Sequence, residues 1–194
     1  GTNMYMMKAE SPGPSVSKLV PKVQSTAKIL YTIYIILTVV EIIFLLIGKM
    51  PLFDTLCLSF GTAGTGGFGI KNDSIASYST YNQVVITVFM ILFGINFNAY
   101  YLLLTKKVMQ AAKNEEVRYY LGIIGLAIVA IAINTREMFT SFGRAFQQAA
   151  FQVGSIITTT GYATTDFNVW PVFSKTILVI LMFVGACAGS TGGG

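Results

Sequence analysis

The most informative stretch of this sequence is Thr62-Ala63-Gly64-Thr65-Gly66-Gly67-Phe68-Gly69, which has a weaker copy at Thr158-Thr159-Thr160-Gly161-Tyr162-Ala163-Thr164. In both stretches a threonine, a variable residue, a glycine, an aromatic residue and a small residue follow one another. Gly67 and Gly161 hold the same place in this order and lie 94 positions apart. Such self-similarity indicates repeated structural units.

The segments around the two glycine-rich stretches repeat as well. In each case an apolar run comes first, a shorter mixed run follows, and a second apolar run comes after the stretch. This order predicts a unit of a membrane helix, a half-helix, a loop and a second membrane helix, present twice. The runs are 29–48, 51–60 and 84–104 in the first copy and 119–133, 142–157 and 176–189 in the second.

The composition predicts an all-α membrane protein. Hydrophobic residues make up 54% of the chain and charged residues only 11%, whereas about 25% of the residues in soluble domains are charged. The runs 29–48 and 84–104 each supply about twenty mostly apolar residues, enough to cross a hydrocarbon core of about 30 Å. The run 119–133 is shorter, so we expect flanking residues to lengthen it.

The net charge of +5 does not indicate a nucleic-acid partner, because eight of the thirteen basic residues lie in two segments beside apolar runs. By the positive-inside rule both segments are cytoplasmic. Two crossings per repeat satisfy this arrangement, since each half-helix enters the membrane and returns on the same side. The two groups are Lys8, Lys18, Lys22 and Lys28, and Lys106, Lys107, Lys113 and Arg118.

The glycine-rich stretches suit an ion filter. Pro51 fits the first position of a short helix to about Ala63, whose carbonyl end would carry about half a negative charge toward the membrane centre. Glycines let the chain return with carbonyls turned inward, and rings of carbonyls can replace the water shell of potassium. The predicted filter residues, with potassium held by their backbone carbonyls, are Thr65, Gly66, Gly67 and Phe68 in the first stretch and Thr159, Thr160, Gly161 and Tyr162 in the second.

Polar residues interrupt the first two apolar runs. Glu41 is interpreted either as a cation-attracting or interhelical group inside the protein, or as a carboxylate near the outer interface that reaches water; both interpretations stay open. Gly94, Asn96 and Asn98 are expected to allow close helix packing or to line a wet cavity, with packing favoured.

The second half-helix has its own polar signature. Ser141 is predicted to cap its start. Gln147, Gln148 and Gln152 then form a polar stripe that a lipid-exposed segment could not carry. Beyond the second stretch, Trp170 is expected at the outer interface as an anchor.

The chain is predicted not to be an enzyme and to use no cofactor. The segment Gly64 to Gly69 formally fits the dinucleotide fingerprint, but that pattern requires a preceding strand, a helix directly after it and an acidic residue about twenty positions on, and the sequence supplies none of them. The chain has no histidine and no cysteine cluster, which argues against zinc, haem and imidazole chemistry. Two alternatives remain: a nucleotide-dependent membrane enzyme and a non-transporting membrane assembly protein.

Four segments together resemble the Trk/Ktr/HKT superfamily of potassium uptake proteins, with the closest likeness to the bacterial TrkH-type membrane subunit. The resemblance implies four membrane-pore-membrane repeats around one potassium-channel-like pore, each with a filter glycine, here Gly67 and Gly161. The segments are Glu10-Ser11-Pro12-Gly13-Pro14, Pro51-Leu52-Phe53-Asp54 through Thr65-Gly66-Gly67-Phe68, Thr158-Thr159-Thr160-Gly161-Tyr162-Ala163-Thr164, and Gly189-Ser190-Thr191-Gly192-Gly193-Gly194.

The resemblance also implies a division of the chain. Residues 1–28 would be a cytoplasmic linker, 29–107 the second membrane-pore-membrane repeat, 108–118 a cytoplasmic loop, and 119–194 the third repeat, truncated in its last helix. Two filter quarters cannot enclose an ion, so the chain alone, as a monomer, is predicted to conduct nothing. The glycine run Gly189, Ser190, Thr191, Gly192, Gly193 and Gly194 matches the family's intramembrane gate loop.

Function and partners follow from the same resemblance. The expected function is potassium uptake through the filter, driven by the membrane potential, in a multi-pass protein of the bacterial inner membrane. Sodium or mixed monovalent cation transport stays open as an alternative. The expected partners are the first and fourth repeats of the same subunit, a second copy in a homodimer, a cytosolic nucleotide-binding regulatory subunit and membrane lipid.

Overall fold

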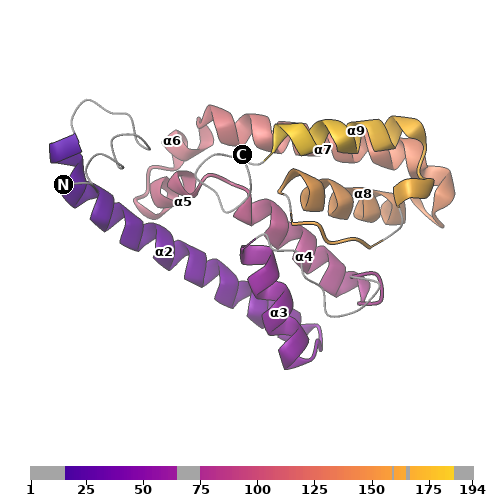
Figure 1. Cartoon of the computed structure of the whole chain (residues 1–194), viewed down its shortest axis with the longest axis horizontal. Helices are drawn as coiled ribbons and strands as arrows, with labels where there is room; N and C mark the ends of the chain where they lie inside the picture. The colour runs from indigo at the N-terminus through magenta and orange to yellow at the C-terminus, as the bar shows by residue number, and fades with distance from the viewer. Residues whose placement is uncertain (1–15, 65–74, 159, 165–166, 186–194) are drawn as a thin grey trace.

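The computed structural model describes residues 16–64, 75–158, 160–164 and 167–185, and every regular element in those ranges is helical. The first half of the chain contains a long helix, a short helix and an apolar helix, and the second half repeats that order (Figure 1). The predicted all-α fold with its repeated unit is therefore confirmed. The helices are α2 (Val16–Ile47), α3 (Leu52–Ala63) and α4 (Thr80–Phe93), followed by α7 (Glu115–Thr135), α8 (Phe142–Ile157) and α9 (Val172–Val184).

The two halves pack internally and meet through α4 and α8. Helices α2, α3 and α4 contact one another, as do α7, α8 and α9, and α4 also lies against α8 (Figure 1). One core cluster surrounds Leu58 and Phe93 in the first half, and another surrounds Ile131 and Leu178 in the second. Tyr162 comes from the second glycine-rich stretch, yet its ring belongs to the first cluster. This ring therefore joins the two halves.

Two described segments are long and apolar enough to cross a membrane, Ala27–Ile47 and Glu115–Met138. The second one confirms that flanking residues lengthen the apolar run 119–133. Large apolar side chains remain exposed on these helices and on α9, among them Leu126 at 76% and Phe183 at 87% exposure. Exposed apolar faces of this kind suit contact with lipid or with further protein.

The apolar run 84–104 is not one continuous helix, contrary to the prediction. Helix α4 ends at Phe93, α5 (Phe97–Leu104) follows it, and the two are bent by 89° relative to each other. Asn96 caps α5, because its side chain accepts a hydrogen bond from the backbone N–H of Asn98 at 2.8 Å. The remaining short elements are α6 (Val108–Ala112), η1 (Arg136–Met138) and η2 (Phe167–Val169).

The break is packed tightly at Gly94. A Cβ atom on this glycine would overlap the Tyr120 hydroxyl and would lie 2.8 Å from the Tyr120 Cζ and 2.9 Å from the Thr158 Cγ2. The Tyr120 hydroxyl in turn donates to the Ile91 carbonyl at 3.0 Å, near the end of α4. The preferred interpretation of Gly94 as a packing residue is therefore confirmed.

Side-chain caps fix the starts of several helices. The Ser141 hydroxyl accepts a hydrogen bond from the backbone N–H of Arg144 at 3.2 Å, which confirms the predicted cap of α8. Asn114 caps α7 in the same way, through the backbone N–H of Val117 at 3.1 Å.

Trp170, which was predicted as an anchor at the outer interface, has its ring buried inside the protein. It is 2% exposed and lies in the second core cluster with Leu178 and Leu181 of α9. A ring of this size buries a large apolar area, and packing it between helices gains more than leaving it outside.

Candidate functional site

The structure describes part of the predicted filter. Thr160, Gly161 and Tyr162 lie in the second glycine-rich stretch, directly after α8. The other predicted site residues lie outside the described residues, so the geometry below is that of the second stretch and its support. Those residues are Thr65, Gly66, Gly67, Phe68 and Thr159 of the filter, and Gly189, Ser190, Thr191, Gly192, Gly193 and Gly194 of the gate loop.

Helix α8 ends where the second stretch begins. The backbone N–H of Thr158 donates to the Gly154 carbonyl at 3.2 Å, and the Thr158 hydroxyl donates to the same carbonyl at 2.6 Å. The hydroxyls of Thr158 and Thr160 share a hydrogen bond of 2.8 Å. The negative end of the α8 dipole therefore lies beside the stretch, where it favours a cation.

The chain turns back at Gly161. Its φ of +84° lies in a region that L side chains rarely adopt, which explains the glycine. The Gly161 N–H donates to the Ser155 carbonyl at 3.2 Å, and the Ser155 hydroxyl donates to the Tyr162 carbonyl at 2.6 Å. The carbonyls of Thr160 and Gly161, by contrast, accept no hydrogen bond from any residue that the structure describes. These two carbonyls are thus available to an ion.

Tyr162 fastens the second stretch to the first half. Its side chain is 1% exposed, and its hydroxyl donates to the Leu58 carbonyl of α3 at 3.3 Å. A second link follows, since the backbone N–H of Ile75 donates to the Ala163 carbonyl at 3.0 Å. Ile75 is the first described residue after the first stretch, so segments adjoining both stretches are bonded to each other.

Gln83 near the start of α4 holds the segment after the first stretch. Its Nε2 donates to three backbone carbonyls, those of Ile75 at 3.3 Å, Ala76 at 3.2 Å and Tyr78 at 3.1 Å. Its Oε1 faces α8 and accepts from the Nε2 of Gln147 at 2.8 Å. Sequence reasoning missed this residue, although a glutamine at the edge of the apolar run 84–104 was a visible signal.

The polar stripe of α8 completes this arrangement. Gln148 is 1% exposed; its Nε2 donates to the Gln83 Oε1 at 3.3 Å, and its Oε1 accepts from the Thr164 hydroxyl. Gln147 accepts at its Oε1 from the Arg144 guanidinium at 2.7 Å. Gln152 is also 1% exposed, so the prediction of a stripe turned into the protein is confirmed. We call Gln83, Arg144, Gln147, Gln148 and Thr164 the glutamine network.

Glu41 is completely buried in α2, with 0% exposure, so the interpretation of a carboxylate that reaches water is wrong. The carboxyl group lies close to Thr62 of α3 and to Tyr162. The Thr62 hydroxyl donates to the Leu58 carbonyl at 2.7 Å. Within the described part of the chain, neither Glu41 oxygen has a hydrogen-bond partner. Glu41 thus lies between residues of both glycine-rich stretches.

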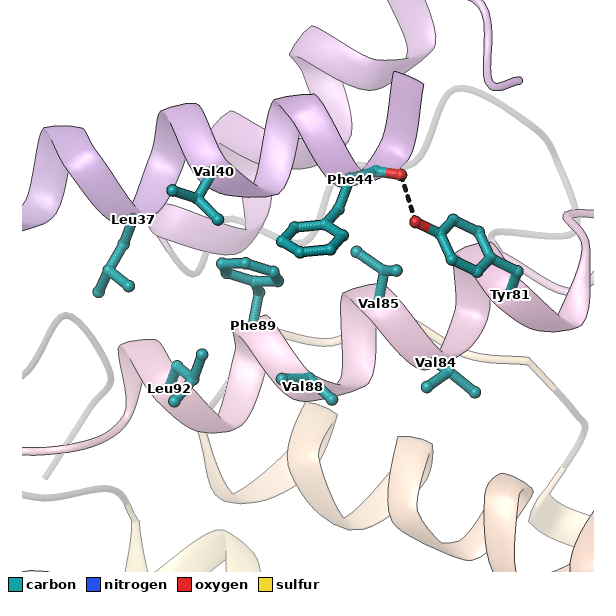
Figure 2. A pocket seen from close by; sticks show the side chains of 9 residues that line it. All are labelled: Leu37, Val40, Phe44, Tyr81, Val84, Val85, Val88, Phe89 and Leu92. Atoms are coloured by element: carbon teal, nitrogen blue, oxygen red, sulfur yellow. Dashed lines mark hydrogen bonds between the residues drawn. The ribbon is translucent and has the colours of Figure 1, made fainter. Parts of the chain in front are cut away.

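An apolar pocket between α2 and α4 has a different character. Figure 2 shows Leu37, Val40 and Phe44 of α2 facing Phe89 and its neighbours on α4, around a volume of about 440 Å³. The Tyr81 hydroxyl closes one end by donating to the Phe44 carbonyl at 2.9 Å. Apart from the Tyr81 hydroxyl, the side chains that line this pocket carry no oxygen, so they offer a cation little to bind.

Known proteins resemble the chain over nearly its whole length. The family model described as "TrkH: Cation transport protein" matches residues 2–132 and 119–194. The Trk system potassium uptake protein TrkH of Salmonella typhimurium is 33% identical over 196 residues, which cover 98% of this chain and 41% of that protein. Its counterpart in Vibrio parahaemolyticus is 36% identical over 199 residues, with the same two coverages of 98% and 41%.

A solved structure agrees with these relatives. The crystal structure of the potassium transporter TrkH from Vibrio parahaemolyticus matches with a TM-score of 0.85 at 31% sequence identity, over 98% of this chain and 42% of that one. The chain therefore spans about two fifths, 41%, of the length of the relatives named above. Those relatives are transport proteins and not enzymes, as the sequence predicted. From the repeated helical unit, the turn at Gly161 and these matches we conclude that the chain belongs to the TrkH family of cation transport proteins.

Proposed function

We propose that this chain supplies two quarters of the ion filter of a potassium uptake subunit. The observation that carries the proposal is the pair of carbonyls at Thr160 and Gly161, which accept no hydrogen bond from a described residue and lie next to the negative end of α8. Carbonyl oxygens arranged in this way can replace the water that a monovalent cation loses on entering a pore. The names of the relatives, potassium uptake proteins of Trk systems, favour potassium as that cation.

The mechanism needs no chemistry beyond coordination. Thr65, Gly66, Gly67 and Phe68 would contribute carbonyls from the first stretch. Thr159, Thr160, Gly161 and Tyr162 would do so from the second, with the Tyr162 carbonyl also accepting from the Ser155 hydroxyl. The membrane potential, worth about 2.3 kcal/mol per charge per 100 mV, drives the ion inward. Transport of potassium in this way uses no cofactor. Sodium or a mixture of monovalent cations is the alternative cargo, because the presence of carbonyl rings alone does not determine which cation is selected.

The proposal extends to the surroundings of the chain. Two quarters leave the ion unenclosed, so the first and fourth repeats of the same subunit complete the pore. Residues 189–194 form the gate loop below the filter. The subunit is a multi-pass protein of the bacterial inner membrane, embedded in lipid, and it works as a homodimer with a cytosolic nucleotide-binding regulatory subunit.

A chimera tests the proposal. Residues 1–194 replace the matching segment of the Vibrio parahaemolyticus relative, and uptake of potassium is measured against competing sodium in cells that lack other potassium uptake. We expect potassium-selective uptake, and we expect Gly67→Ser and Gly161→Ser each to weaken the selectivity. Gly125→Ala is the matched control, since a Cβ at this exposed helical glycine meets no atom within 4 Å. Unchanged discrimination between potassium and sodium in both serine variants would contradict the assignment of Gly67 and Gly161 to the ion filter.

A further inference from the structure

The glutamine network connects the segment after the first glycine-rich stretch to the end of the second stretch. On one side Gln83 holds the carbonyls of residues 75, 76 and 78, just after the first stretch. On the other side Gln148 holds the hydroxyl of Thr164, two residues after Tyr162. Gln83 and Gln148 are each 1% exposed and are bonded to each other, so the connection runs through the protein interior.

The direction of the hydrogen bonds in this network is fixed from both ends. The carbonyls that receive the Gln83 Nε2 can only accept, so the Gln83 Oε1 must face α8. The guanidinium of Arg144 can only donate, so the Gln147 Oε1 must face it. The Nε2 of Gln147 is then left to donate to the Gln83 Oε1, as observed at 2.8 Å. Neither the Gln83 amide nor the Gln147 amide can turn over without breaking hydrogen bonds at both of its ends.

The position of Arg144 lowers the stability of its own helix, α8. The residue lies in the first turn of α8, which contains no acidic residue, and a positive charge there opposes the helix dipole. Its guanidinium bonds the Gln147 Oε1 and also the Thr80 hydroxyl of α4, at 3.4 Å. The arginine thus serves the contact between α4 and α8 rather than the stability of α8.

We infer that Gln83 is a positioning residue for ion selectivity, which holds the two filter quarters of this chain at a fixed distance from each other. The inference rests on the proposed function, since it concerns the filter named there. Buried hydrogen bonds are stronger than exposed ones, and coordination by carbonyls depends on where the backbone is held. Loss of the Gln83 hydrogen bonds releases residues 75–78 and weakens their link to Thr164. The two filter quarters can then move apart, and the filter discriminates less well between potassium and sodium.

The experiment uses the same chimera. Gln83→Leu removes all the side-chain bonds, and Gln83→Glu places a carboxylate oxygen against three carbonyl oxygens. The matched control is Thr87→Val, one turn further along α4, where the buried hydroxyl bonds only the backbone carbonyl of residue 83, at 2.8 Å. We expect both Gln83 variants to lower the potassium-to-sodium uptake ratio by at least about threefold to tenfold, because the loss of one hydrogen bond already gives an effect of this size and the Gln83 side chain makes several. Thr87→Val should keep the ratio of the unmutated chimera.

The possible outcomes distinguish failure of the proposed function from failure of this inference. An unmutated chimera that does not take up potassium contradicts the proposed function, and this inference with it. A selective chimera whose Gln83 variants keep the full ratio overturns the inference alone. If the Gln83 variants do not reach the membrane, Arg144→Met and Gln147→Leu act at the more exposed end of the network. A reduced ratio in these two supports the positioning role, and an unchanged ratio in both assigns the network to folding only.

Discussion

Gly161 shows why a single residue can decide what this site does. Its φ is +84°, and a Cβ built on it would meet no atom within 4 Å. The glycine is therefore required by the backbone conformation and not by lack of space. An L residue in a left-handed conformation costs about 1–2 kcal/mol. A side chain at this position is expected to act by moving the Thr160 and Gly161 carbonyls.

Glu41 is the other residue that is expected to lower the stability of the fold. A completely buried carboxyl group without a hydrogen-bond partner among the described residues lowers the stability of the fold. We predict that Glu41→Met raises the free energy of unfolding of the chimera by about 1–3 kcal/mol, the usual penalty of an unsatisfied buried polar group. Thermal unfolding in detergent measures this, with Thr38→Val on the same helix as the control, because Thr38 already bonds the Tyr34 carbonyl at 2.8 Å.

The same variant reports on function. Intramembrane carboxylates are commonly retained for ion pathways, and Glu41 lies between Thr62 and Tyr162. We expect the stabilised Glu41→Met chimera to take up potassium more slowly. A variant that is destabilised would show instead that Glu41 has a partner in the assembled protein, and the account of this residue would be wrong.

Among the helices, the break between α4 and α5 allows a direct test of packing. We predict that Gly94→Ala destabilises the chimera by about 1–3 kcal/mol, because an added methyl group overpacks the contact with Tyr120 and Thr158. Since Thr158 begins the second glycine-rich stretch, the potassium-to-sodium ratio should fall as well. Unfolding and uptake are measured on the same preparations.

A second substitution checks the cause. Tyr120→Phe removes the hydroxyl that the Gly94 Cβ would overlap, so it should recover part of the stability that Gly94→Ala loses, even though it also removes the bond to the Ile91 carbonyl. If the two changes together cost as much as the sum of each alone, the overlap with Tyr120 is not the cause.

The sequence was sufficient to predict most of the elements but not their connections. The start of α8 at Ser141 and the inward stripe with Gln148 follow from local rules of capping and polarity, and both were predicted. The bend at Gly94 packs against Tyr120, which comes from another helix, and a count of apolar residues could not reveal this contact. The bond from Tyr162 to Leu58 joins residues 104 positions apart and has no local signature.

On the scale of the whole molecule, the interface between α4 and α8 joins the described segments that adjoin the two glycine-rich stretches. Tyr162, the bond between Ile75 and Ala163, and the glutamine network all cross between the halves near this interface. The apolar faces of α2, α7 and α9 remain exposed, and the relatives are more than twice as long as this chain, which covers 41% of them. These faces are therefore available to lipid and to further repeats.

The central claim is that a dehydrated cation contacts the carbonyls at the end of α8. The most direct measurement is anomalous scattering from crystals of the chimera grown with rubidium or thallium, which substitute for potassium. We predict a peak in contact with the Thr160 and Gly161 carbonyls, and its loss in Gly161→Ser. Crystals of an active chimera that show the ion elsewhere in the pore, with no peak at these two carbonyls, would contradict it.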